Sequence, residues 1–241
     1  MAMEHTVRAY DDELARLKNI LTRMGGLAEN QLASAIQAVV KRDSELAVET
    51  MAADAKVDEL EREVDNLAVR LIALRQPVAS DLRTIVAALR ISGDIERIGD
   101  YAANVAKRAV SLNQVPAVPP VHAIPRMGAL VQGMIKDVLD AFVAGDVEEA
   151  LAVWKLDEEV DALYTSLFRE LLTYMMEDPR SITSCTHLLF IAKNIERIGD
   201  HATNIAENVW FLVNGTPLQE PRKKGDLTST PAIDPERAPH G

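Results

Sequence analysis

Apolar residues recur along the chain in alternating steps of three and four positions. The clearest runs are Val57, Leu60, Val64, Leu67, Leu71 and Leu74; Ile95, Ile98, Ala102, Val105, Ala109 and Leu112; and Leu188, Ile191, Ile195, Ile198, Ala202, Ile205, Val209 and Leu212. Such steps place apolar side chains in one stripe along an α-helix. They are typical of antiparallel helices that pack at shallow crossing angles, so the pattern predicts helical bundles.

The chain has 11 prolines, and their positions divide this pattern into segments. Four lie between Asn113 and Pro125, five follow Gly215, and Pro77 and Pro179 stand alone. Because proline breaks a helix interior but is accepted at a helix start, we expect each group to mark a junction. The segments predict six helices, at about residues 5–42, 44–75, 78–113, 124–145, 147–177 and 179–214.

The sequence IERIGD occurs twice, at Ile95–Asp100 and at Ile195–Asp200, which are 100 positions apart. Two further features repeat 103 positions apart: a candidate N-cap aspartate, Asp43 or Asp146, and a pair of acids eleven residues after it. These repeats predict an all-α fold of two tandem, internally duplicated antiparallel three-helix bundles. The predicted boundaries are 1–114 for the first bundle, 115–123 for a proline-rich linker, 124–214 for the second bundle and 215–241 for a disordered tail.

Composition narrows the possible functions. The formal net charge is −11, which disfavours binding to the phosphate backbone of nucleic acids and favours cations or basic protein partners. The single cysteine, Cys185, cannot form an internal disulfide, as expected in a reducing cytoplasm. The N-terminus has no apolar signal core, and no run of about 18 apolar residues occurs. We therefore expect a cytoplasmic protein that meets membranes only through partners.

Four pairs of acids are spaced four residues apart at matching places in the two halves: Asp54 and Asp58, Glu96 and Asp100, Asp157 and Asp161, and Glu196 and Asp200. Like charges at this spacing destabilise a helix by about 0.2–0.5 kcal/mol per pair. Helical geometry places Glu96 and Asp100 beside the buried stripe, so we expect the acids to face outward. Gly99 and Gly199 weaken their helices but permit a close approach to the backbone.

Two interpretations of these acids remain open. They form either a solvated charged face, in which Arg97 and Arg197 offset the repulsion, or two copies of a cation site. Oxygen ligands alone suit hard ions such as Mg, Ca, Mn or iron, and zinc less well. His201 follows Asp200, but its counterpart is Tyr101, which favours a surface role over a ligand role.

Two rival classes are a carboxylate-bridged metal enzyme and a metal-free structural bundle. Di-iron helical bundles use Glu-x-x-His pairs that project inward, and no histidine of this chain has a glutamate three positions before it. The chain also has no G-x-x-x-x-G-K phosphate-binding loop. Both observations disfavour an enzyme, whereas a metal-free bundle remains compatible with an adaptor.

Two longer segments carry a family resemblance: SGDIERIGDYAANVAKR and MMEDPRSITSCTHLLFIAKNIERIGDHATNIAENV. With the RQPVASDLRTIVAALRISGDIERIGD segment of the first half, they resemble the PhoU family over roughly residues 5–214. The resemblance implies two similar three-helix bundles, a homodimer and a non-enzymatic role. It implies an adaptor between the ATPase of the phosphate ABC transporter and a sensor histidine kinase, a negative regulator that maintains phosphate homeostasis.

The resemblance also implies metal binding on acid-x-x-x-Asp motifs. In this sequence the motif falls on Asp54, Asp58, Glu96, Asp100, Asp157, Asp161, Glu196 and Asp200, which are the implied ligands. The implied metals are divalent or trivalent ions (Fe, Mn, Mg or Zn). Asp94 departs from the repeat, because its counterpart is Asn194, and it lies on the far side of the helix from Glu96. We do not count Asp94 as a ligand.

Overall fold

The computed structural model describes residues 2–77 and 79–219, with side chains from Tyr10 onward except at position 79. In this part of the chain all regular structure is helical. The elements are α1 (Ala2–Lys41), α2 (Ser44–Ala53), α3 (Ala55–Arg75), α4 (Ala79–Leu112), a 3₁₀ turn η1 (Pro119–His122), α5 (Ala123–Ala144), α6 (Val147–Glu177), a second 3₁₀ turn η2 (Pro179–Ser181) and α7 (Ile182–Asn214). The predicted all-α fold is confirmed, and most predicted ends lie within about three residues of the observed ones. Most of the predicted tail lies outside the described residues.

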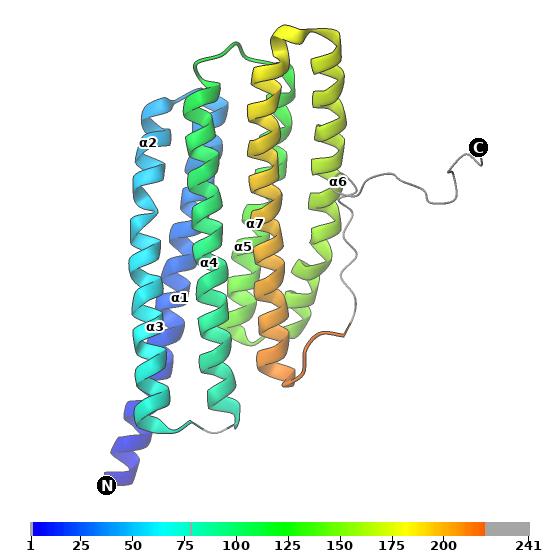
Figure 1. Cartoon of the computed structure of the whole chain (residues 1–241). Helices are drawn as coiled ribbons and strands as arrows, with labels where there is room; N and C mark the ends of the chain where they lie inside the picture. The colour runs from blue at the N-terminus through cyan, green and yellow to red at the C-terminus, as the bar shows by residue number, and fades with distance from the viewer. Residues whose placement is uncertain (1, 78, 220–241) are drawn as a thin grey trace, which may run out of the picture.

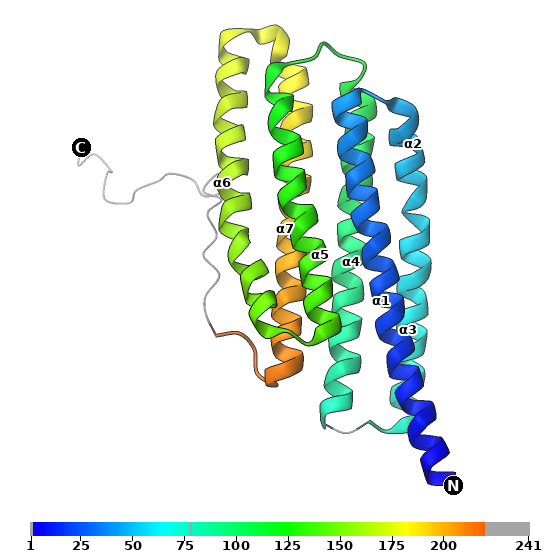
Figure 2. The same ribbon diagram turned by 180° about the vertical axis from the view of Figure 1, so that it is seen from behind.

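Helices α1, α2, α3 and α4 form one bundle, and α5, α6 and α7 form the other. The two bundles lie side by side, with α4 next to α7 on one face (Figure 1) and α1 next to α5 on the opposite face (Figure 2). Because α4 and α7 run in opposite directions, equivalent positions of the two halves lie opposite each other only near the middle of this seam, where the repeated hexamers lie. Toward the ends of the seam non-equivalent residues meet, such as Arg90 with Phe211 and Arg108 with Phe190. The duplicated segments therefore meet at the centre of the molecule.

The apolar stripes predicted from the sequence form the interior. Ile95 and Ile98 are fully buried, as are Ile195 and Ile198, and one continuous cluster of buried side chains spans both halves. Leu74, at the end of the α3 stripe, is the exception and is exposed in the last helical turn. Burial of such side chains is the main stabilisation of a fold of this kind.

Close crossing of α1 and α5 depends on two glycines. A Cβ atom at Gly25 would collide with Leu139, and a Cβ atom at Gly128 would collide with Ile36. The two contacts are equivalent under the duplication, since 128 − 25 and 139 − 36 both equal 103. The duplication thus includes the first helix of each half, with the same offset of 103 that relates the second helices.

The middle helices begin as predicted. The Asp43 carboxylate accepts hydrogen bonds from the backbone N–H groups of Glu45 and Leu46, at 3.1 and 2.9 Å. Asp146 accepts the equivalent pair in the second half, at 2.9 and 3.1 Å. One difference was not predicted: the middle helix of the first half is interrupted at Asp54, which separates α2 from α3.

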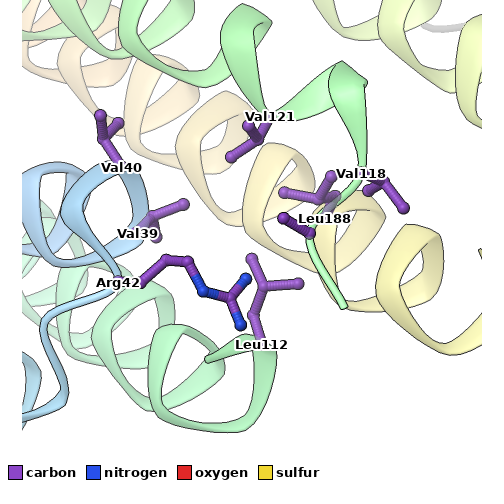
Figure 3. Close-up of a pocket in the computed structure, with 8 residues that line it drawn as sticks. Val39, Val40, Arg42, Leu112, Val118, Val121 and Leu188 are labelled. Atoms are coloured by element: carbon purple, nitrogen blue, oxygen red, sulfur yellow. The ribbon is translucent and has the colours of Figure 1, made fainter. Parts of the chain in front are cut away.

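A short irregular segment after α4 connects the two bundles and is held by Arg42. The Arg42 guanidinium donates hydrogen bonds to the carbonyl oxygens of Asn113 and Val115, at 2.8 and 2.6 Å. Beside it lies a cavity of about 110 Å³ whose lining is otherwise aliphatic, with Val118, Val121 and Leu188 along one side (Figure 3). Its lining carries no acid or nucleophile, so this cavity belongs to the packing around the linker.

Candidate functional site

The acids of the first half come together where α3 lies beside α4. This first acid cluster comprises Asp54, Asp58, Glu61, Glu96 and Asp100, all of them partly buried. Asp54 lies at the break between α2 and α3, and the negative charges of Asp100 and Asp58 act on it. The pairs predicted on two separate helices therefore face one another, and Glu61 of α3 lies close to Glu96 and Asp58.

Burial among like charges changes the protonation of this cluster. Desolvation is the largest cause that raises the pKa of Glu96, and the charges of Asp100 and Glu61 raise it further. Desolvation likewise raises the pKa of Asp54, where the hydrogen bond from Gln31 lowers it and the charge of Asp100 raises it. The protein thus pays an electrostatic cost to hold these carboxylates together.

Gln31 on α1 belongs to this site, although the sequence analysis did not single it out. Its side chain is 4% exposed, and its amide Nε2 donates to Asp54 Oδ1 at 3.1 Å. Its other polar atom, Oε1, is buried and has no hydrogen-bond partner. Both oxygens lie against Gly99, where a Cβ atom would be 3.0 Å from Asp54 Oδ1 and 3.4 Å from Gln31 Oε1. Gly99 therefore makes room for polar oxygens that approach α4.

Nearby arginines neutralise the first acid cluster only weakly. Arg97 lies 3.7 Å from Glu96 and 3.9 Å from Asp100, and its side chain is 60% exposed. Arg62 lies 3.8 Å from Asp58 and is 72% exposed. Ion pairs of this length and exposure contribute about 0–1 kcal/mol, so most of the negative charge of the cluster persists.

The second acid cluster, Asp157, Asp161, Glu196 and Asp200, differs in burial. Asp157 and Asp161 are 3% exposed and Glu196 is 5% exposed, so the prediction that the acids face outward is wrong for these three, whereas Asp200 is half-buried. The physical reason is that α6 packs directly against this side of α7, which covers the acids that a single-helix projection places beside the buried stripe. Gly199 accordingly contacts Val160 and Val131 rather than solvent.

The second acid cluster also has its own cation. Lys193 Nζ lies 2.9 Å from Glu196 Oε1 and 4.9 Å from the centre of the Tyr164 ring. Thr203 Oγ1 makes a long 3.4 Å hydrogen bond to Asp157 Oδ1. Desolvation raises the pKa of Glu196, and Lys193 acts in the opposite direction. A neighbouring lysine is a usual way in which a protein compensates the charge of a buried carboxylate.

The donor chemistry of these clusters suits a hard cation, but the side chains do not form a closed coordination shell. Within residues 2–77 and 79–219, no group of three or more His, Cys, Asp or Glu side chains is arranged to hold a metal ion. In the first acid cluster, the side-chain oxygen of Gln31 is buried and has no hydrogen-bond partner, so it suits the role of a ligand to a hard ion. Ligation there requires the carboxylates to rotate toward one another.

Asp94 and His201, the two departures from the repeat, contact each other across the α4–α7 seam. Asp94 Oδ1 lies 2.9 Å from His201 Nδ1 and accepts a 3.3 Å hydrogen bond from Asn204. The His201 ring also stacks on Tyr101, with 5.7 Å between ring centres. Asp94 thus has a structural partner outside the acid clusters, and His201 is a half-buried seam residue rather than a surface residue.

Across the described part of the chain, no helix is both long and apolar enough to cross a membrane.

Comparison with known proteins assigns the chain to a family. The PhoU domain family matches residues 21–109 and 124–209, one match in each half. A phosphate-specific transport system accessory protein PhoU homolog from Caulobacter vibrioides is 55% identical over 227 residues, covering 94% of this chain and 99% of that protein. A homolog of the same name from Zymomonas mobilis is 48% identical, covering 94% and 95%.

Solved structures agree with these matches. The crystal structure of PhoU from Pseudomonas aeruginosa superposes with a TM-score of 0.84 at 42% identity, covering 86% of this chain and 100% of that chain. PhoU from Streptococcus pneumoniae, described as a phosphate transport system regulatory protein, superposes with a TM-score of 0.80 at 29% identity. The chain belongs to the PhoU family.

Proposed function

We propose that this protein is a cytoplasmic accessory regulator of phosphate-specific transport that keeps the phosphate-starvation response off when phosphate is plentiful. The observation that carries the proposal is the match to the Caulobacter vibrioides accessory protein over 94% of this chain and 99% of that protein. Similarity over nearly the whole length of both proteins extends beyond the core to the surfaces through which a regulator acts.

The proposed mode of action is non-enzymatic. The protein works as a homodimeric adaptor between the ATPase subunit of the phosphate ABC transporter and a sensor histidine kinase. One finding supports this mode: long helices joined to one core form the described part of the chain. Rigid helical surfaces suit contact with other proteins, which is how an adaptor transmits a signal.

We further propose that the carboxylates of the acid clusters bind metal ions. The proposed ligands are the eight acids of the acid-x-x-x-Asp motifs, Asp54, Asp58, Glu96, Asp100, Asp157, Asp161, Glu196 and Asp200. Repulsion within the first acid cluster supports this proposal, because a divalent ion would relieve it. The bound ion would supply positive charge between α3 and α4 and would order the two helices there.

Deletion of the protein tests the regulatory proposal. We expect a phosphate-starvation reporter to be active in phosphate-rich medium in the deletion strain and silent again when the wild-type gene is restored. A reporter that stays silent in the deletion strain would contradict the proposal. Adaptor action is checked separately, by co-purification of the protein with the transporter ATPase and with the kinase from cells grown in high phosphate.

A further inference from the structure

The internal duplication allows each acid cluster to serve as a reference for the other. Equivalent positions are 103 apart in the first two helices and 100 apart in the third helix of each half. The positions around the acids that differ in chemical type between the halves include Gln31 against Met134, Glu61 against Tyr164, and Gly93 against Lys193. All three differences change the charge or the oxygen donors of the two sites.

In the second acid cluster, Lys193 occupies the place that a bound cation would take. Its side chain is 30% exposed, and its ammonium group contacts Glu196 at 2.9 Å and lies over the face of Tyr164, which replaces the first cluster's Glu61. An ammonium group held by a carboxylate and by an aromatic face is stabilised by both contacts. A divalent ion that enters this site must displace Lys193 from both.

In the first acid cluster, the equivalent of Lys193 is Gly93, which has no side chain. A Cβ atom at Gly93 would meet no other atom within 4 Å, so a side chain could leave the helix there. The cation beside Glu96 is instead Arg97, which lies 3.7 Å away and is 60% exposed, against 30% for Lys193. Glu61 adds a carboxylate where the second half has Tyr164, and Gln31 adds an amide oxygen where the second half has Met134. The amide oxygen is buried, has no hydrogen-bond partner and lies beside the Asp54 carboxylate.

We propose that the two acid clusters are not equivalent: the first binds a hard divalent cation with Gln31 as an added oxygen donor, whereas Lys193 serves as the built-in cation of the second. This inference rests on the proposed metal binding and assigns it to one site. Oxygen donors from carboxylates and amides together are what Mn²⁺ and Mg²⁺ prefer. The duplicated motif has thus become one ligand site and one internally neutralised site.

Titration of the purified full-length chain with Mn²⁺ tests the assignment, after chelator treatment and with calorimetry as the readout. The matched pair is Glu96→Gln and Glu196→Gln, which remove one carboxylate from equivalent positions without changing side-chain size. We expect Glu96→Gln to weaken Mn²⁺ binding at least 10-fold and Glu196→Gln to change it less than threefold. Gln31→Met, which copies the second half, should weaken binding about 10-fold, and Gln31→Glu should preserve it.

Variants that add a lysine to the first acid cluster or remove Lys193 from the second test the assignment independently. Gly93→Lys should abolish tight Mn²⁺ binding, since it installs the built-in cation in the first acid cluster. Gly133→Lys, another open helical glycine but in α5, adds the same charge and should leave binding intact. Lys193→Met should raise the stoichiometry by one ion. Far-UV circular dichroism of each variant confirms that it is folded.

The outcomes separate the two proposals. Equal loss of binding in Glu96→Gln and Glu196→Gln, or intact binding in Gly93→Lys, would overturn the assignment while metal binding itself stands. A wild-type chain that takes up no Mn²⁺ would remove the proposed metal binding and this inference together. Neither result bears on the regulatory role, which the reporter strain tests.

Discussion

Glycine has different roles at the two equivalent positions of the repeated hexamer. At Gly99 the neighbours are polar oxygens, and the nearest would be 3.0 Å from an added Cβ atom. At Gly199 the neighbours are the methyl groups of Val160 and Val131, at 3.4–3.6 Å, which is ordinary van der Waals contact. The same residue therefore admits a carboxylate in one half and only lowers helix propensity in the other.

Alanine at these glycines should separate the two roles. Removal of a glycine from a helix interior stabilises a protein by about 0.5–1 kcal/mol where the site has room. We expect Gly199→Ala to raise the free energy of unfolding by that amount. Gly99→Ala should fall short of it by about 1 kcal/mol or more, because the added methyl group crowds the Asp54 carboxylate. Urea denaturation of both variants at neutral pH is the measurement, and equal gains would contradict the difference in environment.

How much the sequence could predict is also clearest at single residues. The 3-4 spacing was sufficient to place Ile95 and Ile98 in the interior, because it depends only on helix geometry. The burial of Asp157 and Glu196 was not predictable in this way, because a projection of one helix contains no information about which neighbour covers its flank. Gln31 was missed for the same reason: its role depends on a contact between α1 and the break at Asp54.

At the scale of the helix, side chains cap the starts of the middle helices, whereas the acids of α3 lie close to those of α4 and repel them. Asp43 and Asp146 each satisfy two backbone N–H groups that the first helical turn leaves without partners. The acids of α3 and α4 do the opposite, since burial and mutual repulsion raise the pKa values of Asp54, Glu61 and Glu96. Capping thus stabilises the starts of α2 and α6, whereas the charge cluster weakens the contact between α3 and α4.

Loss of either cap should reduce stability by a similar amount. Replacement of an N-cap aspartate by alanine typically costs about 1 kcal/mol. We expect Asp43→Ala and Asp146→Ala each to lower the free energy of unfolding by about 0.5–2 kcal/mol, measured by urea denaturation. Asp43→Asn retains an acceptor oxygen and should lose far less. A loss in Asp43→Asn as large as that in Asp43→Ala would assign the effect to charge rather than to capping.

Stability of the metal-free protein should increase on mild acidification. The pKa of Glu96 is raised above its ordinary value of 4.5 in the folded chain, so between the two values the folded state binds more protons than the unfolded state. The free energy of unfolding therefore rises as the pH falls through the raised pKa, and this contribution is lost again as the pH rises. Glu96→Gln should flatten that dependence at pH values above 4.5.

Urea denaturation in the presence of a chelator, at several pH values, measures this effect. The control is Glu59→Gln, an exposed glutamate of α3, whose profile should follow that of the wild type. The difference between Glu96→Gln and wild type isolates the cluster, because all other titrating groups are common to both. A Glu96→Gln profile parallel to the wild-type profile would show that the cluster carries no net repulsion.

At the scale of the whole molecule, the two homologous halves share one interior. The buried cluster runs without interruption from α1 to α7, and the glycine contacts of α1 with α5 join the halves a second time. Cys185 and Leu188 of the second half and Leu112 of the first all belong to it. The sequence therefore contains two homologous halves, but the two halves pack around one hydrophobic core.

A shared interior predicts one cooperative unfolding transition, and the placement of the tryptophans makes this measurable. The chain has two tryptophans, Trp154 and Trp210, and both lie in the second half. Leu71 is buried on α3, a helix of the first half that lies on the far side of its bundle from α7. We expect Leu71→Ala to cost about 2–5 kcal/mol. If the halves unfold together, the tryptophan fluorescence transition of Leu71→Ala in urea moves to lower concentration by as much as the far-UV circular dichroism transition.

A fluorescence midpoint that stays at the wild-type value would show that the second half unfolds by itself. Leu171→Ala, a buried leucine of α6, provides the control, because it must shift the tryptophan signal in either case.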